Sequence, residues 1–204
     1  MTRRITTRDR EAMIADFSYE ARLAYMAFCA ERCVAEARRH APAADQLERE
    51  PLLREGIELL WATAGGLGQA DPARIAAVRD HATGYERPHP GGEAVVYTRD
   101  IALVSAARVL AKGMRVLAEP AAATPGYVVG VLDGPAVLIG TIYEDAMASR
   151  KQEVAVIDAA LERLREAAPP ITRALFEGIP DWPRGALTRL YAAGRLTDSS
   201  VDEE

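Results

Sequence analysis

The sequence has few of the residues that build disulfide frameworks, metal clusters or aromatic-rich sites. It holds 2 cysteines and 3 histidines among 204 residues, and aromatic residues make up 6% of it. Secreted domains held by disulfides need a denser set of cysteines, so this count predicts a reducing, cytoplasmic setting. Positive charge is not in excess either, because the formal net charge is -5. A negative protein repels phosphate backbones, so nucleic acid is not an expected partner.

Long apolar runs and catalytic signatures are also missing. The N-terminal stretch MTRRITTRDREAMIADF has arginines but no apolar segment of signal-peptide length. No run elsewhere reaches the roughly 20 residues that cross a bilayer, so no membrane contact is expected. There is no nucleophile elbow, no phosphate loop after a strand, no zinc-protease motif and no Glu-x-x-His pair for a di-metal site. We therefore predict no metal and no cofactor, and the sequence favours a non-enzymatic protein without deciding the matter.

Helical periodicity is what the sequence has. Residues 17–40 contain no proline or glycine, and apolar residues recur about every 3.6 positions along them. Prolines in first turns and glycines after last turns mark further helices. Ser149 and Gln152 have the spacing of a capping box, which predicts a helix start at that point. The predicted helices cover 17–40, 51–64, 72–83, 93–112 with an end at Gly113, and 149–168, with short helices from 171 to 194 around Trp182.

Residues 127–143 fit two interpretations. Their β-branched residues flank the pair Asp133 and Gly134, as they would in a small hairpin. Thr124 before a proline looks instead like a helix start, and so does Gly134 before the next proline. Because a lone hairpin among helices would leave its edges unpaired, a helix is favoured and the hairpin remains the alternative.

The elements together predict an all-α, single-domain bundle of six to eight helices. The helical domain is expected over 17–193. An N-terminal arm or short helix precedes it over 1–16. An acidic, loose tail follows it over 194–204.

The stretch YMAFCAERCVAEARRH, residues 25–40, holds Cys29, Cys33 and His40. Residues four apart in a helix have Cβ atoms about 5 to 6 Å from each other, whereas a disulfide needs about 3.5 to 4.5 Å. His40 lies roughly 10 Å along the helix from Cys33, too far to share a metal ion with it. The geometry predicts that both cysteines are small buried hydrophobes.

Glu31 and Arg32 lie between the cysteines and have two interpretations. Adjacent helix positions point about 100° apart, so the two do not pair with each other, and Arg32 can reach Glu36 one turn on. They are either a solvated strip with apolar stems, or partly buried anchors for a neighbouring helix or a partner.

Three short motifs resemble the YjaG-like family of bacterial helical proteins. These are the Cys-Ala-Glu-Arg core at 29–32, the Ile-x-Leu-Leu-Trp helix at 57–61, and the Tyr-led amphipathic helix at 97–110. The similarity spans roughly 19–165, and the glycine-rich segment 125–140 departs from the family's more plainly helical middle. The resemblance implies an all-α fold and brings no agreed activity. Helical proteins with a Glu-Arg pair are also similar, in fold class, to immunity proteins of bacterial toxin systems.

The leading hypothesis is a non-enzymatic cytoplasmic protein that acts by binding another protein, in a toxin-neutralising (immunity-like) or regulatory role. Its basis is the lack of catalytic motifs together with an acidic charge, which speeds encounter with a basic partner. The residues expected to anchor structure or form the recognition surface are Glu31, Arg32, Glu58 and Trp61.

Two alternatives remain open. The first is an enzyme or small-molecule binder with a pocket between helices, and the second is a homo-oligomeric structural module. The polar residues expected to line such a pocket are His81, Tyr97, Arg99, Asp100 and Glu144.

Overall fold

The helices predicted from the sequence form an all-α bundle. The computed structural model describes residues 5–40, 51–84, 101–179 and 185–189, and these contain no sheet, only one isolated bridge between Tyr143 and Leu187. Three 3-10 turns, η1 (Pro120–Ala122), η2 (Gly130–Leu132) and η3 (Arg173–Phe176), join or follow the α-helices. The α-helices are α1 (Thr7–Ala15), α2 (Tyr19–His40), α4 (Pro51–Ala64), α5 (Pro72–Gly84), α6 (Ile101–Ala118), α7 (Pro125–Val129), α8 (Asp133–Ile142) and α9 (Ala146–Glu166).

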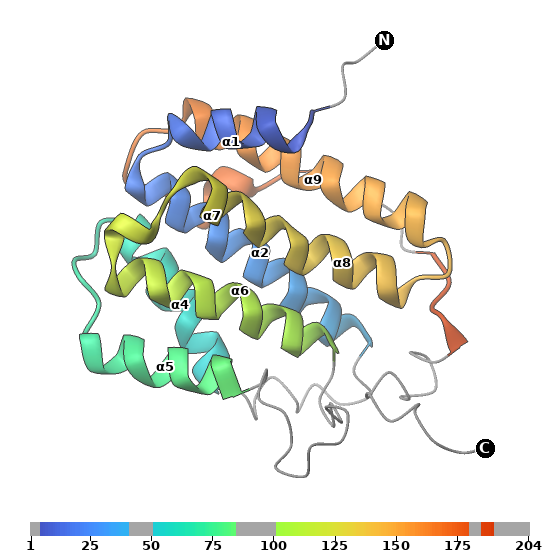
Figure 1. Ribbon diagram of the computed structural model, residues 1–204, viewed down its shortest axis with the longest axis horizontal. Coiled ribbons are helices and arrows are strands. Elements are labelled where there is room, and N and C mark those ends of the chain that lie inside the picture. Colours follow the sequence, from blue (N-terminus) through green and yellow to red (C-terminus); the bar gives the residue numbers. More distant parts are fainter. Residues whose placement is uncertain (1–4, 41–50, 85–100, 180–184, 190–204) are drawn as a thin grey trace.

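Helix α2 is the central element. It packs against α4, α6, α8 and α9, and it passes behind α6 and α8 in Figure 1. Leu23, Tyr25 and Met26 on it have no exposed surface. A helix that is apolar on most of its faces is stable only when other elements surround it.

The segment with two interpretations is helical. Helix α7, η2 and α8 follow one another without a break, and the Thr124 hydroxyl accepts a hydrogen bond from the Tyr127 N–H as the predicted N-cap. Helix α8 begins at Asp133, one residue before the predicted start at Gly134, and it follows η2 directly without a side-chain N-cap. Pro125–Ile142 has the length (18 residues) and mean hydropathy (1.4) of a membrane-crossing helix, and half of it is buried inside the protein. A buried core helix has the same character.

Two predicted helix boundaries are wrong. Helix α6 passes through Gly113 and ends at Ala118, because Gly113 is a contact point rather than a cap: a Cβ there would lie 3.0 Å from Leu60 Cδ1. Helix α9 begins at Ala146, one turn before the predicted start. Its N-cap is Asp145, whose carboxylate accepts from the Ala148 N–H at 3.0 Å. Ser149 is buried within the helix.

Glycines allow the helices to approach closely. A Cβ at Gly56 on α4 would lie 2.7 Å from Val78 Cγ1 on α5, and one at Gly134 on α8 would lie 2.5 Å from Val109 Cγ2 on α6. Real Cβ atoms are not found at such distances, so these two positions set the spacing of α4 from α5 and of α8 from α6.

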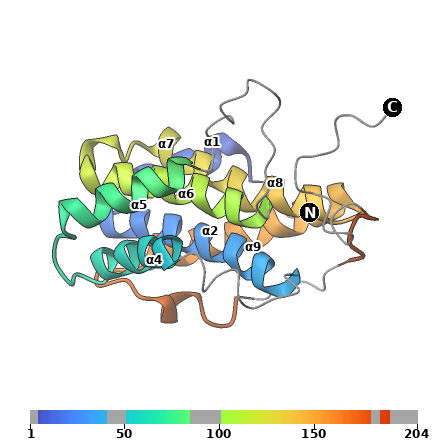
Figure 2. The ribbon, with the colours of Figure 1, turned by 90° about the horizontal axis from the view of Figure 1, so that it is seen from below.

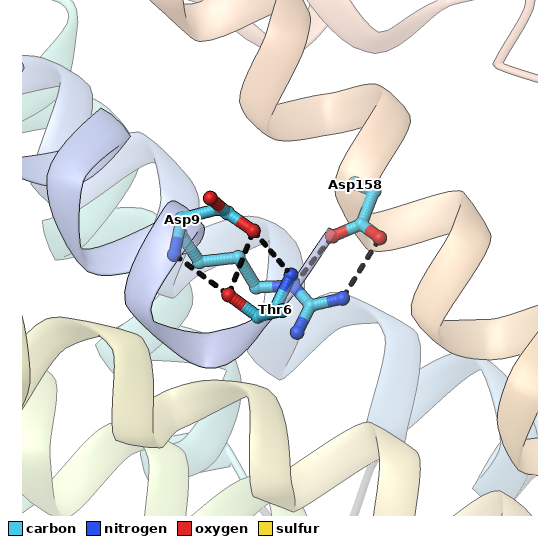
Figure 3. A network of polar contacts seen from close by, with 4 residues as sticks. Thr6, Asp9 and Asp158 are labelled. Carbon is cyan, nitrogen blue, oxygen red and sulfur yellow. Dashed lines mark hydrogen bonds and ion pairs between the residues drawn. The ribbon is translucent and has the colours of Figure 1, made fainter. Parts of the chain in front are cut away.

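The N-terminal segment forms a short helix that is joined to α9. Thr6 and Asp9 make a capping box at the start of α1, in which the Thr6 hydroxyl accepts from the Asp9 N–H at 3.2 Å (Figure 3). Arg10, which is buried, donates from Nε and Nη2 to the Asp158 carboxylate at 2.5 and 2.8 Å. The bidentate ion pair therefore fixes α1 on the bundle.

Several predictions fall elsewhere or outside the described residues. The predicted helix at the start of the 171–194 region is a single 3-10 turn, η3. Residues 93–100 of the helix expected over 93–112, Trp182 with its surroundings, and the tail over 194–204 lie outside the described residues.

The close approach at Gly134 can be tested by adding one methyl group. We expect Gly134→Ala to lower the free energy of unfolding by about 1 to 2 kcal/mol in urea denaturation. The destabilisation from overpacking is larger than the stabilisation from the higher helix propensity of alanine. Gly126→Ala on α7 is the control, since the nearest atom to its Cβ would be 3.8 Å away. This variant should be unchanged or up to about 1 kcal/mol more stable. Equal effects at both positions would contradict the packing role of Gly134.

Candidate functional site

Residues 171–179, which follow α9, lie along the outer side of α4 and α2, and we call this segment the strap (Figure 2). At its start, the N–H of buried Ile171 donates to the Ala64 carbonyl at 3.0 Å. Near its end, Arg163 Nη1 on α9 donates to the carbonyls of Leu175 and Glu177 at 2.7 and 2.6 Å. The strap is thus held at both ends by hydrogen bonds to its backbone.

Arg173 is the polar centre of the strap. Its Nε donates to Glu31 Oε1 on α2 at 2.6 Å, and its Nη2 and Nη1 donate to the two oxygens of Glu58 on α4 at 2.7 and 3.1 Å. The guanidinium also lies 5.3 Å from the ring centre of Trp61. Partial burial lowers the pKa of Arg173, but the hydrogen bonds to Glu58 and Glu31 raise it by more, so it lies above its ordinary value.

Phe176 is the apolar centre of the strap. Its ring stacks on Phe28 of α2 at 4.7 Å between centroids and meets Trp61 of α4 edge-on at 5.6 Å. Its exposed fraction is 9%. Aromatic pairs at such distances add about 0.5 to 1.5 kcal/mol beyond the area that they bury. The strap therefore places one charged and one aromatic side chain on the face formed by α2 and α4.

A groove of about 650 Å³ lies beside the strap, between α2 and α4. Buried Val34 and Ile57 line it, together with the exposed Ala35. Arg39 and Arg54 line it as well, and so does the Glu31–Arg173–Glu58 cluster. The groove thus has an apolar floor and a charged rim.

Arg32 points to a different element, α9. It makes a bidentate ion pair with Glu153, with Nη2 at 2.6 Å from Oε2, and the Glu153 side chain is fully buried. One turn further along α2, the buried Glu36 accepts a hydrogen bond from the Tyr143 hydroxyl at 2.8 Å. Buried charges of this kind require partners, so these contacts fix α9 and the end of α8 against α2.

The two cysteines are buried, free thiols, as the helix geometry predicted. Burial raises the pKa of both thiols, although the nearby Tyr25 hydroxyl and the charge of Arg32 lower the pKa of Cys29 by a smaller amount. A thiol that resists ionisation is a poor nucleophile and a poor metal ligand. Among the described residues, no group of three His, Cys, Asp or Glu side chains is placed to hold a metal ion.

A second, smaller hollow of about 290 Å³ lies where α4, α5 and α6 meet the start of α2. Tyr19, Thr63, Ile75 and Arg79 are among its lining residues. Neither this hollow nor the groove is lined by His81 or Glu144.

The structure brings together three of the predicted site residues. Glu31, Glu58 and Trp61 all contact Arg173. Arg32 lies next to Glu31 on α2, but it forms its ion pair with Glu153 on α9. His81 is on α5, Glu144 is exposed after α8, and Tyr97, Arg99 and Asp100 lie outside the described residues.

Sequence reasoning missed Arg173, Phe176 and Glu153. Each is separated from its partners on α2 by more than 100 residues. Helical periodicity reports only on neighbours within a few turns, so it carries no signal for such contacts. The one local hint is the Arg-Ala-Leu-Phe sequence itself, which places a charge and an aromatic three residues apart.

The described part of the chain defines an all-α protein whose most developed site is a charged and aromatic face between α2 and α4. No protein-family model, no curated protein and no solved structure matches the chain. The resemblance to the YjaG-like family therefore stays a prediction.

Removal of Arg32 and removal of Arg173 should have different effects on stability. We expect Arg32→Ala to lower the free energy of unfolding by about 3 kcal/mol, because it takes the ion-pair partner from a fully buried carboxylate. Arg173→Ala should cost about 1 kcal/mol, since its ion pairs are half-exposed. Arg165→Ala, on an exposed pair with Glu162, is the control and should change stability by less than about 0.5 kcal/mol. A loss at Arg32 no larger than at Arg165 would show that the buried pair contributes nothing.

The burial of the thiols has a chemical consequence. In guanidinium chloride at pH 8, we expect Ellman's reagent to release 2 equivalents of thionitrobenzoate per chain, one for each cysteine. The native protein should not react over the same time, because its thiols are covered and their pKa is raised. Rapid reaction of the native protein would contradict the buried position of Cys29 and Cys33.

Proposed function

We propose that this protein is non-enzymatic and acts in the cytoplasm by binding another protein, in a toxin-neutralising or regulatory role. The recognition surface is the α2–α4 face, which comprises the groove and the residues beneath the strap. The single observation that supports this proposal is that the face already binds a peptide segment, the chain's own strap, through an ion-pair cluster and an aromatic cluster.

The face has the character of a preorganised binding surface. Glu31 and Glu58 are held in position by Arg173, and Trp61 is held by Phe176, so little side-chain entropy remains to be lost on binding. The groove beside them is open, and its floor is apolar. Peptide-recognition surfaces combine these features, since apolar contacts supply affinity and charged rims supply orientation.

The charge of the chain supports the same proposal. A net charge of -5 accelerates encounter with a basic partner. A homo-oligomer and a small-molecule binder are the alternatives, and the 290 Å³ hollow is the feature that favours the second of these.

Blocking the groove tests the proposal. Ala35 is exposed and lines the groove, so Ala35→Arg fills it without touching the core. Ala155→Arg, at an exposed position on α9, is the matched control. In quantitative co-purification from the native host, we expect the wild type and Ala155→Arg to retain the same stoichiometric protein, and Ala35→Arg to retain at least ten-fold less of it.

Two outcomes would count against the proposal. Recovery of no stoichiometric protein by the wild type would remove its basis. Equal recovery by Ala35→Arg and Ala155→Arg would show that a partner binds elsewhere. Light scattering on the same samples identifies a homo-oligomer, and a thermal-shift screen of metabolites identifies a small-molecule ligand.

A further inference from the structure

We infer that the strap is an internal ligand, and that its position on α2 and α4 is a docking site for a partner segment with an arginine followed three residues later by an aromatic residue. This inference rests on the proposed function and names the chemistry of the partner. The observation that carries it is the set of contacts that Arg173 and Phe176 make with three residues of the face, Glu31, Glu58 and Trp61.

The spacing follows from the 3-10 geometry of η3. Side chains three residues apart in a 3-10 turn point in the same direction, so Arg173 and Phe176 both face the bundle. The face below offers the matching pair of features, two carboxylates for a guanidinium and two rings for an aromatic side chain. A segment with another spacing in one such turn would reach only one of the two features.

The contacts of the strap are of a kind that can be exchanged. The side chains of Arg173, Glu31 and Glu58 are 45%, 33% and 58% exposed, so the ion pairs form and separate in contact with water. A second arginine would make the same hydrogen bonds, and a second aromatic ring would bury the same surface. Replacement of the strap by an identical external segment therefore changes the contact energy little.

Tethering nevertheless favours the strap. A segment joined to its site by a short linker has an effective concentration in the millimolar range, which an external segment with the same contacts must exceed. A partner that displaces the strap at lower concentration needs further contacts. The groove that starts at Arg173 supplies them, with Val34 and Ile57 as an apolar floor. The partner segment is thus longer than the arginine-aromatic pair and carries apolar residues for the groove.

Peptide binding in trans tests this inference. The probe is a fluorescein-labelled peptide of the strap sequence, ITRALFEGI. In fluorescence anisotropy, we expect the full chain with Arg173→Ala and Phe176→Ala to bind the peptide at least ten-fold more tightly than the wild type, whose strap competes. Arg173→Ala alone changes only a half-exposed side chain, so it provides a second, well-folded test, and circular dichroism checks both variants.

Three controls decide the result. The peptide with Arg173→Glu should bind the doubly substituted protein at least ten-fold more weakly than the unchanged peptide does. Adding Glu31→Arg and Glu58→Arg to that protein should weaken binding of the unchanged peptide by the same factor. Excess wild-type peptide added to the wild-type protein should increase deuterium exchange at the amides of 171–179. Equal or absent binding to the folded Arg173→Ala variant and the wild type would overturn the inference, as would binding that ignores the peptide's arginine. Loss of the cellular partner by Ala35→Arg would then still support the proposed function, so the two failures are distinguishable.

Discussion

The structure depends on how α2, a helix buried on most sides, satisfies its charged side chains. Glu31 contacts the strap, Arg32 pairs with α9, and Glu36 accepts a hydrogen bond from Tyr143 at the end of α8. An unpaired charge at the buried positions of Glu153 and Glu36 would cost several kcal/mol, whereas Glu31 is partly exposed and its ion pair contributes less. Each of these three charges therefore joins α2 to one neighbour: the strap, α9 or the end of α8.

Close helix contacts complete this arrangement. A side chain at Gly56 or Gly134 would collide with Val78 or Val109, respectively, and one at Gly113 would press tightly on Leu60. Small residues at these points let α4 approach α5, α6 approach α4, and α8 approach α6. The polar contacts specify the neighbours, and the glycines set the spacing.

The candidate site depends on the same arrangement of helices. The strap covers part of the α2–α4 face, and the groove continues beyond Arg173 over the apolar floor. This face is where Glu31, Glu58 and Trp61, the residues that sequence reasoning selected as anchors or recognition residues, come together.

The sequence by itself determined the helical class, the burial of the two cysteines on α2 and the N-cap at Thr124, because these depend on periodicity and on residues a few positions apart. Only the tertiary structure decided that Gly113 is a contact point and not a helix end, that Arg32 pairs with Glu153, and that Arg173 and Phe176 dock on α2 and α4. These features join residues far apart in the chain. Local sequence patterns carry no information about which distant surfaces meet, and packing supplies it.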